Sequence, residues 1–263
     1  MTSAGRVAVA AALGLAGSFG PPAAALEVAP YLRVGADAAW EANISGRESV
    51  AAEPLASFFA AGQADVLASA LLDAGADVAL TEALGVSGSL GARGVGYSRY
   101  PALGYVTGNA TLQVRLLELP GDLDATVGYG YRDDFLGWRA QWLSATLERP
   151  LPWALVAYAA AGADWSRAAV PAGDRSGPFA DLGVRRRFRE TGTSVRLGLD
   201  LAAPAYASGR RDQSASLLCA LNQRLARGLY MTGKARLDWV SSSEANRSYA
   251  APAFSVGWAW LLP

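Results

Sequence analysis

Residues 26–41 read LEVAPYLRVGADAAWE, and they alternate between two kinds of side chain. The even-numbered positions carry no charge, whereas the odd-numbered positions carry four. The charged residues are Glu27, Arg33, Asp37 and Glu41. Successive side chains of a β-strand point to opposite faces, so this period of two predicts a strand with one apolar and one polar face.

The same alternation recurs in further segments along the chain. They span about 65–81, 84–93, 106–116, 123–132, 137–148, 154–166, 178–188, 194–203, 214–225, 229–239 and 253–260. No stretch after residue 26 holds the roughly 18 consecutive apolar residues that a membrane-spanning helix needs. We therefore expect an all-β protein over residues 26–263: a closed antiparallel up-and-down β-barrel of about 12 strands, with about 10 or about 14 as alternatives.

The connections between these segments are expected to alternate in length. Short turns fall near 82–83, 119–122, 149–153, 189–193 and 226–228. Longer connections fall near 42–64, 95–105, 133–136, 167–177, 204–213 and 241–248. An even number of strands with this alternation is typical of membrane barrels, whose periplasmic turns are short and whose outer loops are long. Both chain ends would then lie on the periplasmic side.

The segment at 137–148 fits the alternation least well. Its two tryptophans, Trp138 and Trp142, fall out of phase with Leu143 and Leu147. A β-bulge inserts one extra residue and so shifts the phase of a strand. We therefore expect a bulge in this segment.

The polarity of the two faces indicates where water lies. Nearly every polar face carries a charge, and burying such charges in a packed core costs several kcal/mol each unless they are paired. A water-filled lumen solvates them instead. The apolar faces are nearly free of charge, with Arg186 as the clearest exception. We therefore expect a transmembrane β-barrel with charges inside and apolar side chains towards lipid.

Aromatic residues lie near the ends of the predicted strands. Those towards the long connections are Trp40, Tyr131, Trp138, Trp165 and Trp239, and those towards the short turns are Trp153, Trp258 and Trp260. This distribution matches the two aromatic girdles of a membrane barrel.

The polar faces supply the charges that we expect to line the lumen. They are Arg33, Asp37, Asp73, Asp77, Arg93, Arg115, Asp124, Asp181, Arg185, Arg187, Arg196, Asp200, Lys234, Arg236 and Asp238. Asp65 shares a face with Asp73 and Asp77, which lie about 13 Å apart at the rise of a strand. These carboxylates form either a ladder for cations or ion pairs with arginines of neighbouring strands, and we favour pairing.

The arginines allow two similar interpretations. Arg185, Arg187 and Arg196 form either a basic strip that guides anions or ion pairs with Asp181 and Asp200. The same alternatives apply to a second group, which consists of Arg93, Arg99 and Arg115.

The first 25 residues have the form of an export signal. Arg6 provides a basic start, residues 7–15 provide an apolar core, and the alanines at 23–25 provide a cleavage site of small residues. We expect cleavage before Leu26.

The composition argues against several classes of function. The chain has 23 basic and 23 acidic residues, so it lacks the basic excess of a nucleic-acid-binding protein, and we expect no nucleic-acid partner. It contains no histidine, which is the usual base near neutral pH, so we expect no enzyme activity. Its single cysteine, Cys219, forms neither an intramolecular disulfide nor a Cys-based zinc site. We therefore expect no catalytic residue, no metal and no cofactor.

The last predicted strand carries Phe254, Val256, Trp258 and Trp260 on its apolar face. With the export signal and the alternating segments, it resembles the final strand of Gram-negative outer-membrane β-barrel proteins, a class-level resemblance that covers residues 26–263. In that class this strand is read by the barrel-insertion machinery. The resemblance implies an outer-membrane location, contact with outer-membrane lipid and this machinery as a partner during assembly. The chain departs from the pattern by continuing to residues 261–263 after the last aromatic.

The expected function is passive passage of small hydrophilic solutes or an exported polymer, such as a polysaccharide, through a porin-like channel. The alternative is a non-conducting structural or assembly barrel that anchors an envelope complex. Residues 54–59, in the longest connection, either fold inward as a constriction or pack over the rim. Pro30 and Pro252 lie in the first and last strands, and because proline donates no hydrogen bond, we expect the seam between these strands to be the weakest.

Overall fold

The computed structural model describes residues 27–42, 64–99, 101, 104–135, 137–244 and 247–262. The predicted signal peptide (1–25) and residues 54–59 lie outside this part of the chain. Within the described part, no helix has the length and apolar character needed to cross a membrane.

The described chain consists almost entirely of β-strands. They are Glu27–Glu41 (β1), Asp65–Ala79 (β2), Leu84–Tyr97 (β3), Tyr105–Leu119 (β4), Leu123–Asp133 (β5), Arg139–Leu151 (β6), Leu155–Arg167 (β7), Arg175–Phe188 (β8), Thr193–Ala202 (β9), Ala205–Tyr206 (β10), Asp212–Ala226 (β11), Leu229–Ser242 (β12) and Tyr249–Leu262 (β13). A 3₁₀ turn, Pro171–Gly173 (η3), precedes β8.

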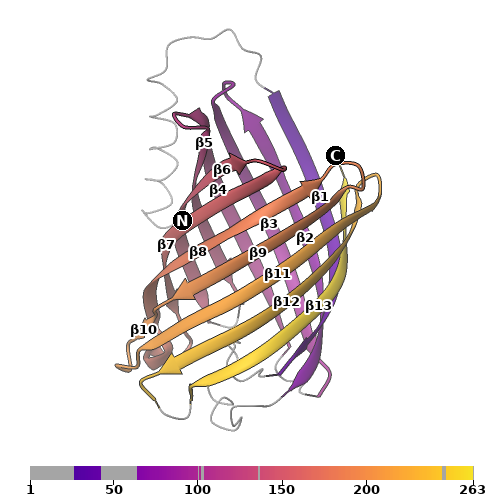
Figure 1. The fold of residues 1–263 in the computed structure, drawn as a ribbon. Helices are drawn as coiled ribbons and strands as arrows, with labels where there is room; N and C mark the ends of the chain where they lie inside the picture. Colours follow the sequence, from indigo (N-terminus) through magenta and orange to yellow (C-terminus); the bar gives the residue numbers. More distant parts are fainter. Residues whose placement is uncertain are drawn as a thin grey trace.

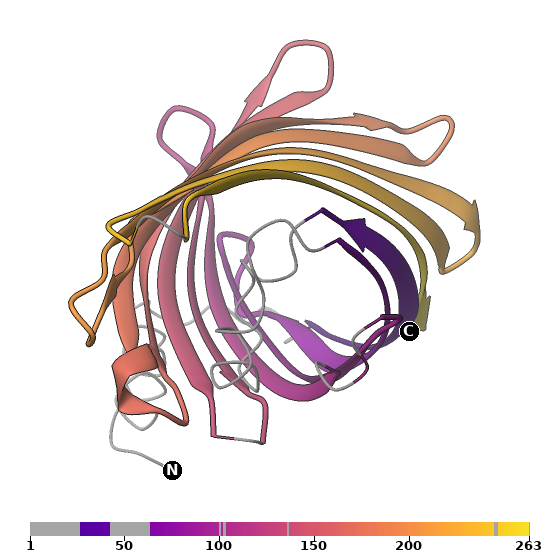
Figure 2. The same cartoon turned by 90° about the horizontal axis from the view of Figure 1, so that it is seen from below.

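All the strands except the two-residue β10 form one closed antiparallel barrel, which confirms the expected fold and the expected number of 12 (Figures 1 and 2). Each strand of the wall pairs with the next one along the chain, β9 pairs with β11, and β13 returns to pair with β1. The short strand β10 lies beside the start of β8.

The seam of the barrel joins Leu32–Glu41 of β1 to Ala253–Leu262 of β13 without a register shift. Pro30 and Pro252 lie beyond the two ends of this ladder, and their register partners belong to β2 and β12. At one end of this ladder the Ala42 N–H donates to the Pro252 carbonyl at 3.1 Å, and Pro252, which has no N–H, cannot donate in return. The weakness of the seam therefore stays a prediction.

The connections alternate between short and long, as expected. The short turns occupy 80–83, 120–122, 152–154, 189–192 and 227–228. In the turn between β6 and β7, Trp153 and Ala154 both adopt left-handed backbone conformations, with φ of 62° and 56°. This pair is what a type I′ turn requires to join two twisted strands. The wall begins at Glu27 and ends at Leu262 on this side, which we call the short-turn end; the opposite side is the long-loop end.

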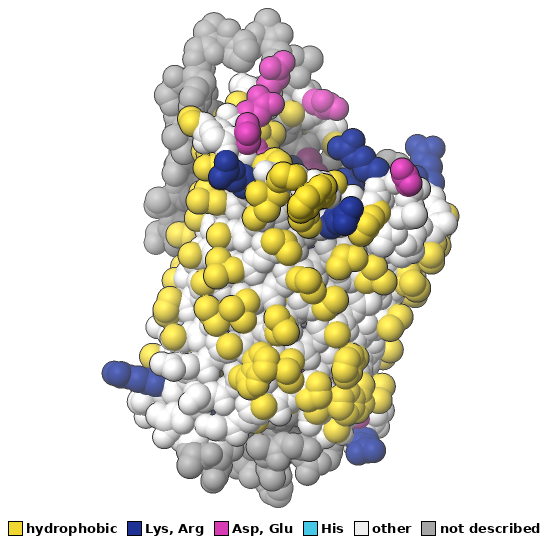
Figure 3. Space-filling view, in the orientation of Figure 1, with side chains coloured by type: hydrophobic (Ala, Val, Ile, Leu, Met, Phe, Trp, Pro, Cys, Tyr) yellow, Lys and Arg dark blue, Asp and Glu magenta, His cyan; other side chains and the backbone are white. Residues whose placement is uncertain are grey.

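The outer surface of the wall is apolar. Leu90 and Val256 are 69% and 64% exposed, although large apolar residues of a soluble protein are usually buried. Figure 3 shows hydrophobic side chains spread over the wall and charged side chains gathered mainly at the short-turn end of this view. Arg186 lies on the outer surface, where its guanidinium carbon is 4.7 Å from the centroid of the Phe188 ring. This arrangement exposes an apolar surface to lipid.

Two expectations for the region of β6 are wrong. β6 pairs with β5 and β7 without a register shift, so it contains no bulge. Trp142 is out of phase because it faces the lumen, where Gly130 leaves room for its ring. Trp138 is only 8% exposed, so its ring does not form part of a girdle on the outer surface. Its backbone N–H donates to Asp134 Oδ1 at 2.9 Å in the turn before β6.

Candidate functional site: the charged lumen

The register of the barrel determines which side chains face its lumen. Odd-numbered residues of β1–β4, β8 and β13 face inward, as do even-numbered residues of β5–β7, β9, β11 and β12. Every charge that the sequence assigns to the lumen occupies one of these positions, from Arg33 on β1 to Asp238 on β12. The exposed large apolar residues of the strands occupy the opposite phase, except Leu117, at the irregularity near the end of β4, and Leu261 on β13. The lumen is therefore polar and the outer wall apolar.

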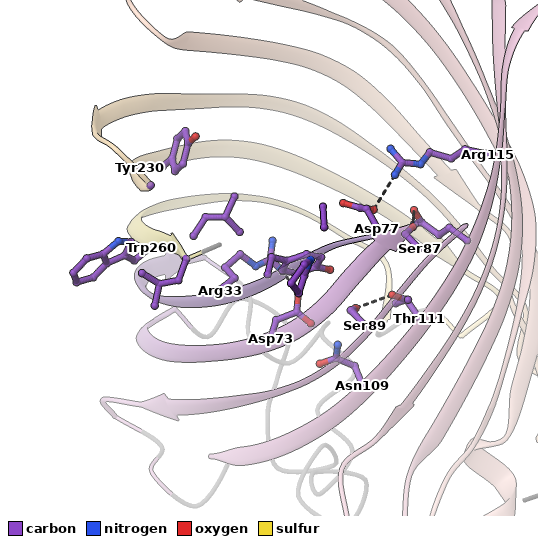
Figure 4. A pocket seen from close by; sticks show the side chains of 18 of the residues that line it. Arg33, Asp73, Asp77, Ser87, Ser89, Asn109, Thr111, Arg115, Tyr230 and Trp260 are labelled. Carbon is purple, nitrogen blue, oxygen red and sulfur yellow. Dashed lines mark hydrogen bonds and ion pairs between the residues drawn. The ribbon is translucent and has the colours of Figure 1, made fainter. Parts of the chain in front are cut away.

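Three ion pairs join the inward faces of β1, β2, β3 and β4. Arg33 Nη2 lies 3.2 Å from Asp73 Oδ2, Arg115 Nη2 lies 2.8 Å from Asp77 Oδ1, and Arg93 Nη2 lies 3.2 Å from Asp37 Oδ2. Figure 4 shows the first two pairs on the inner surface of the wall. Between the two interpretations of Asp73 and Asp77, the structure thus shows pairing with arginines of neighbouring strands.

The pair between Arg93 and Asp37 spans three strands. Ser69 of β2 lies between them, donates to Asp37, and accepts from Arg93 Nε at 3.1 Å and Nη2 at 2.9 Å. Such a shared hydroxyl holds both charged groups in place, because each partner of a charge-assisted hydrogen bond restricts the other.

Asp65 does not join this group. It lies at the long-loop end of β2, where its carboxylate accepts from the Ser98 hydroxyl at 2.6 Å and from the Arg99 backbone N–H at 3.1 Å. Its role is to hold the chain that leaves β3, and it does not extend a row of carboxylates with Asp73 and Asp77.

A second group of charges lies on β6–β9 and β12. Arg196 pairs with Asp181 and donates from Nε to the Tyr158 hydroxyl at 2.7 Å. Asp181 and Asp200 are direct register partners on β8 and β9. Two further pairs complete the group: Arg185 Nη2 lies 2.6 Å from Glu148 Oε2, and Arg236 Nη2 lies 2.7 Å from Asp238 Oδ2.

The predicted basic strip is therefore only partly available to a solute. Arg185 and Arg196 are paired, whereas Arg187 and Lys234 have no ion pair among the described residues, and both are exposed inside the barrel. Asp124 lies near the short-turn end and accepts from the Glu118 backbone N–H at 3.1 Å.

Several inward groups were not singled out from the sequence. Glu148 and Tyr158 hold the arginines described above, and Asp164 pairs with Arg175 at 2.9 Å. No lumen charge was predicted on β6 and β7, but Glu148, Tyr158 and Asp164 lie in the phase opposite to the apolar residues of these strands, and that phase was the signal that could have identified them. Trp142 also faces inward, with the Arg132 guanidinium carbon 5.9 Å from its ring centroid.

A cavity of about 990 Å³ lies in the lumen towards the short-turn end. Its wall includes the ion pairs of Asp73 and Asp77 and a row of uncharged polar residues on β3 and β4 (Figure 4). This row consists of Ser87, Ser89, Asn109, Thr111 and Gln113. Within the described part of the chain, no group of three or more Cys, His, Asp or Glu residues is placed to bind a metal ion.

The residues of the predicted insertion signal share the outer surface of β13. Phe254, Val256, Trp258 and Trp260 are all exposed there. The Phe254 ring stacks on that of Trp40 across the seam, with 6.0 Å between centroids.

No protein-family model matches the sequence, and no curated protein matches it. Among solved structures, an outer-membrane channel from Pseudomonas putida F1 has a similar fold, with a TM-score of 0.63 over 93% of this chain and 100% of that chain. The sequence identity is 13%. The protein therefore has the fold of an outer-membrane β-barrel, which confirms the class-level resemblance and supports the expected outer-membrane location.

Two further solved structures are more distant. A bacterial polysaccharide outer membrane secretin gives a TM-score of 0.47 at 10% identity, over 89% of this chain and 98% of that chain. The KdgM porin gives a TM-score of 0.45 at 9% identity, over 86% of this chain and 98% of that chain.

Proposed function

We propose that the protein is an outer-membrane channel that gives passive passage to small hydrophilic solutes or to an exported polymer. The main support is the exposure of charged side chains inside the barrel. Arg33, Arg93 and Arg115 face the lumen, yet their side chains are 45%, 43% and 42% exposed. A packed core would bury these groups at high cost, so their exposure favours a lumen that contains water.

The strand number is consistent with this proposal. Barrels of about eight strands fill with side chains, whereas barrels of about sixteen leave an aqueous channel. A wall of 12 strands lies between these limits, and a cavity of about 990 Å³ lies in its lumen towards the short-turn end. Both signs of charge line the lumen, which suits polar solutes better than apolar ones.

Conductance of the purified protein in planar lipid bilayers tests the proposal. We expect discrete current steps that scale with salt concentration. Absence of steps above the baseline at every applied voltage, with protein that is shown to be folded, would overturn it.

We also propose that the chain is exported with a cleaved signal peptide and that no catalytic reaction takes place in the barrel. N-terminal sequencing of the protein from outer membranes should begin at Leu26. Another first residue would place the cleavage site elsewhere. The lack of histidine supports the second part, since the usual base near neutral pH is missing.

A second candidate function is an assembly barrel that anchors an envelope complex, and the charge distribution at the short-turn end favours it. The turns after β2 and β4 carry Glu82 and Asp122 and no cation, and Glu118 lies next to them at the end of β4. The strand ends and turns after β6, β8 and β11 carry Arg149, Arg189, Arg224 and Arg227, with Glu190 as the acidic exception. A rim divided into an acidic and a basic arc is suited to orient a partner of complementary charge.

Native electrophoresis of solubilised envelopes tests this second candidate. A complex larger than the barrel should be present and should dissociate in the double variant Arg189→Glu, Arg227→Glu. Arg247→Glu, at the long-loop end, is the matched control and should leave the complex intact. Migration of the wild type as the barrel alone would count against an anchoring role.

A further inference from the structure

The uncharged wall of the cavity has a regular arrangement of hydrogen-bonding groups. On β3 and β4, Ser87 is in register with Gln113 and Ser89 with Thr111. The hydroxyls of Ser89 and Thr111 lie 2.8 Å apart, while Ser87 Oγ and Gln113 Oε1 are at 3.5 Å. Because alternate residues of a strand point to the same side, these groups present donors and acceptors at regular intervals to the lumen.

The charges around this wall compensate one another. Arg33 pairs with Asp73 and Arg115 pairs with Asp77, so the two cations and two anions next to the wall sum to zero. Figure 4 shows both carboxylates close to the row of hydroxyl and amide groups. A solute at this wall therefore meets hydrogen-bonding groups with little net charge to attract or repel an ion.

One acceptor beside the wall lacks a partner. Asp73 is 4% exposed, and its Oδ1 has no hydrogen-bond partner in the described part of the chain. A Cβ at Gly91 would lie 2.9 Å from this oxygen and 3.0 Å from Asn109 Nδ2, so the gap between them exists because residue 91 has no side chain. Unsatisfied buried acceptors are uncommon and costly, and a solute hydroxyl reaches this one when the Asp73 or Asn109 side chain moves to open the gap over Gly91.

Aromatic side chains bound the same cavity. The Tyr31 ring lies over Gly75, because a Cβ added at residue 75 would come within 2.7 Å of Tyr31 Cζ. Tyr230 faces the same cavity from β12. Ligand sites commonly combine such apolar surfaces with a few placed polar groups, in cavities of about 300–1,000 Å³. The volume here is at the upper end of that range.

We infer that this wall is a binding site for an uncharged polyhydroxylated solute, of the saccharide class, within the lumen. The row of serine, threonine and amide groups contacts the solute hydroxyls, and the cavity aromatics contact its less polar faces. The inference rests on the proposed channel, because the wall is part of its lumen. Arg224 and Arg227 also line the cavity, at the end of β11 and in the turn after it, so an anionic solute would be held by these side chains and not by the wall.

Current block by maltohexaose tests the site in the full-length protein. We expect a concentration-dependent reduction of single-channel current in the wild type. Thr111→Val removes one wall hydroxyl at constant shape, and it should raise the blocking concentration by about two- to tenfold, the usual effect of one neutral hydrogen bond. Thr146→Val is the matched control, because Thr146 faces the lumen on β6 outside the cavity wall. Equal block in the two variants would overturn the site.

A charged oligomer tests the preference for uncharged solutes, and a binding measurement tests the site independently of the channel. A glucuronate oligomer of equal length should block less well than maltohexaose, and stronger block by the acidic oligomer would overturn the preference for uncharged solutes. If the folded protein conducts no current, the channel is overturned. Calorimetric titration of maltohexaose into the detergent-solubilised protein then decides the site alone: binding that Thr111→Val weakens supports it, and absence of binding overturns it.

Discussion

Gly130 of β5 lies directly beneath the indole ring of Trp142 of β6, its register partner on the lumen side of the wall. A Cβ at residue 130 would overlap the ring, so the missing side chain is what allows the tryptophan to turn inward. The Arg132 guanidinium lies near the same ring, and a cation over an indole face is a favourable contact.

Substitution of Gly130 by alanine should therefore destabilise the barrel. The new methyl group displaces Trp142 from its place, and overpacking of this kind costs about 1–3 kcal/mol. Unfolding by guanidinium in detergent micelles measures the loss. Gly85→Ala is the control, since Gly85 also faces inward but its nearest non-neighbouring atom is 3.6 Å from the added Cβ. Equal stability of the two variants would show that the ring has room to move.

The fold could be predicted because the alternation of inward and outward side chains in a strand depends on the sequence of that segment alone. The alternation in each segment revealed which residues face inward without knowledge of any neighbour. The position of Trp142 could not be derived in this way, because it depends on a glycine in another strand and on the register that brings the two together. The same holds for the triad of Arg93, Ser69 and Asp37, whose members come from three strands.

Arg33→Met should lower the stability of the barrel more than Arg115→Met. The partner of Arg33 is Asp73, whose side chain is 6% exposed, whereas that of Arg115 is Asp77, at 48%. Loss of the partner of a buried carboxylate costs about 1–3 kcal/mol, while an exposed pair contributes about 0–1 kcal/mol. Thermal unfolding of both variants under the same conditions checks the order, and a larger loss for Arg115→Met would contradict the burial difference.

Arg187 and Lys234 form no ion pair with another described residue, and reversal of their charges should change the ion selectivity of the channel. In the double variant Arg187→Glu, Lys234→Glu, the reversal potential in a salt gradient should shift towards cation selectivity by on the order of 10 mV, because charge along a confined path shifts the local potential. Arg186→Glu is the control, since this neighbouring side chain lies on the outer surface. An equal shift in the control would mean that the charges act from outside the path.

Thiol labelling should distinguish the two faces of β11. Cys219 is exposed on the outward face, so in lipid bilayers it should resist a membrane-impermeant maleimide. A cysteine introduced by Asn222→Cys in a Cys219→Ser background faces the lumen and should react. Both thiols should react after unfolding. Rapid labelling of Cys219 in the folded, membrane-embedded protein would contradict the apolar outer wall.

Trp260→Ala should reduce the yield of folded barrel in the outer membrane. We propose that the insertion machinery reads the outward side chains of β13, and Trp260 is 49% exposed there. The heat-modifiable band in gel electrophoresis of outer membranes measures folded barrel. Trp239→Ala is the control, because Trp239 is similarly exposed on β12. Equal yields would argue that the signal lies elsewhere in the chain.

The pairing of β13 with β1 has a consequence for how the molecule folds. All other pairings between wall strands join strands that follow one another in the wall, so each closes a much shorter loop than the seam does. Only this last junction brings together residues separated by nearly the full chain, and its entropic cost grows only with the logarithm of that separation. Until it forms, both edge strands expose unpaired backbone groups, which are templates for aggregation. The nascent barrel thus depends on protection of two edges that disappear together in a single closing event.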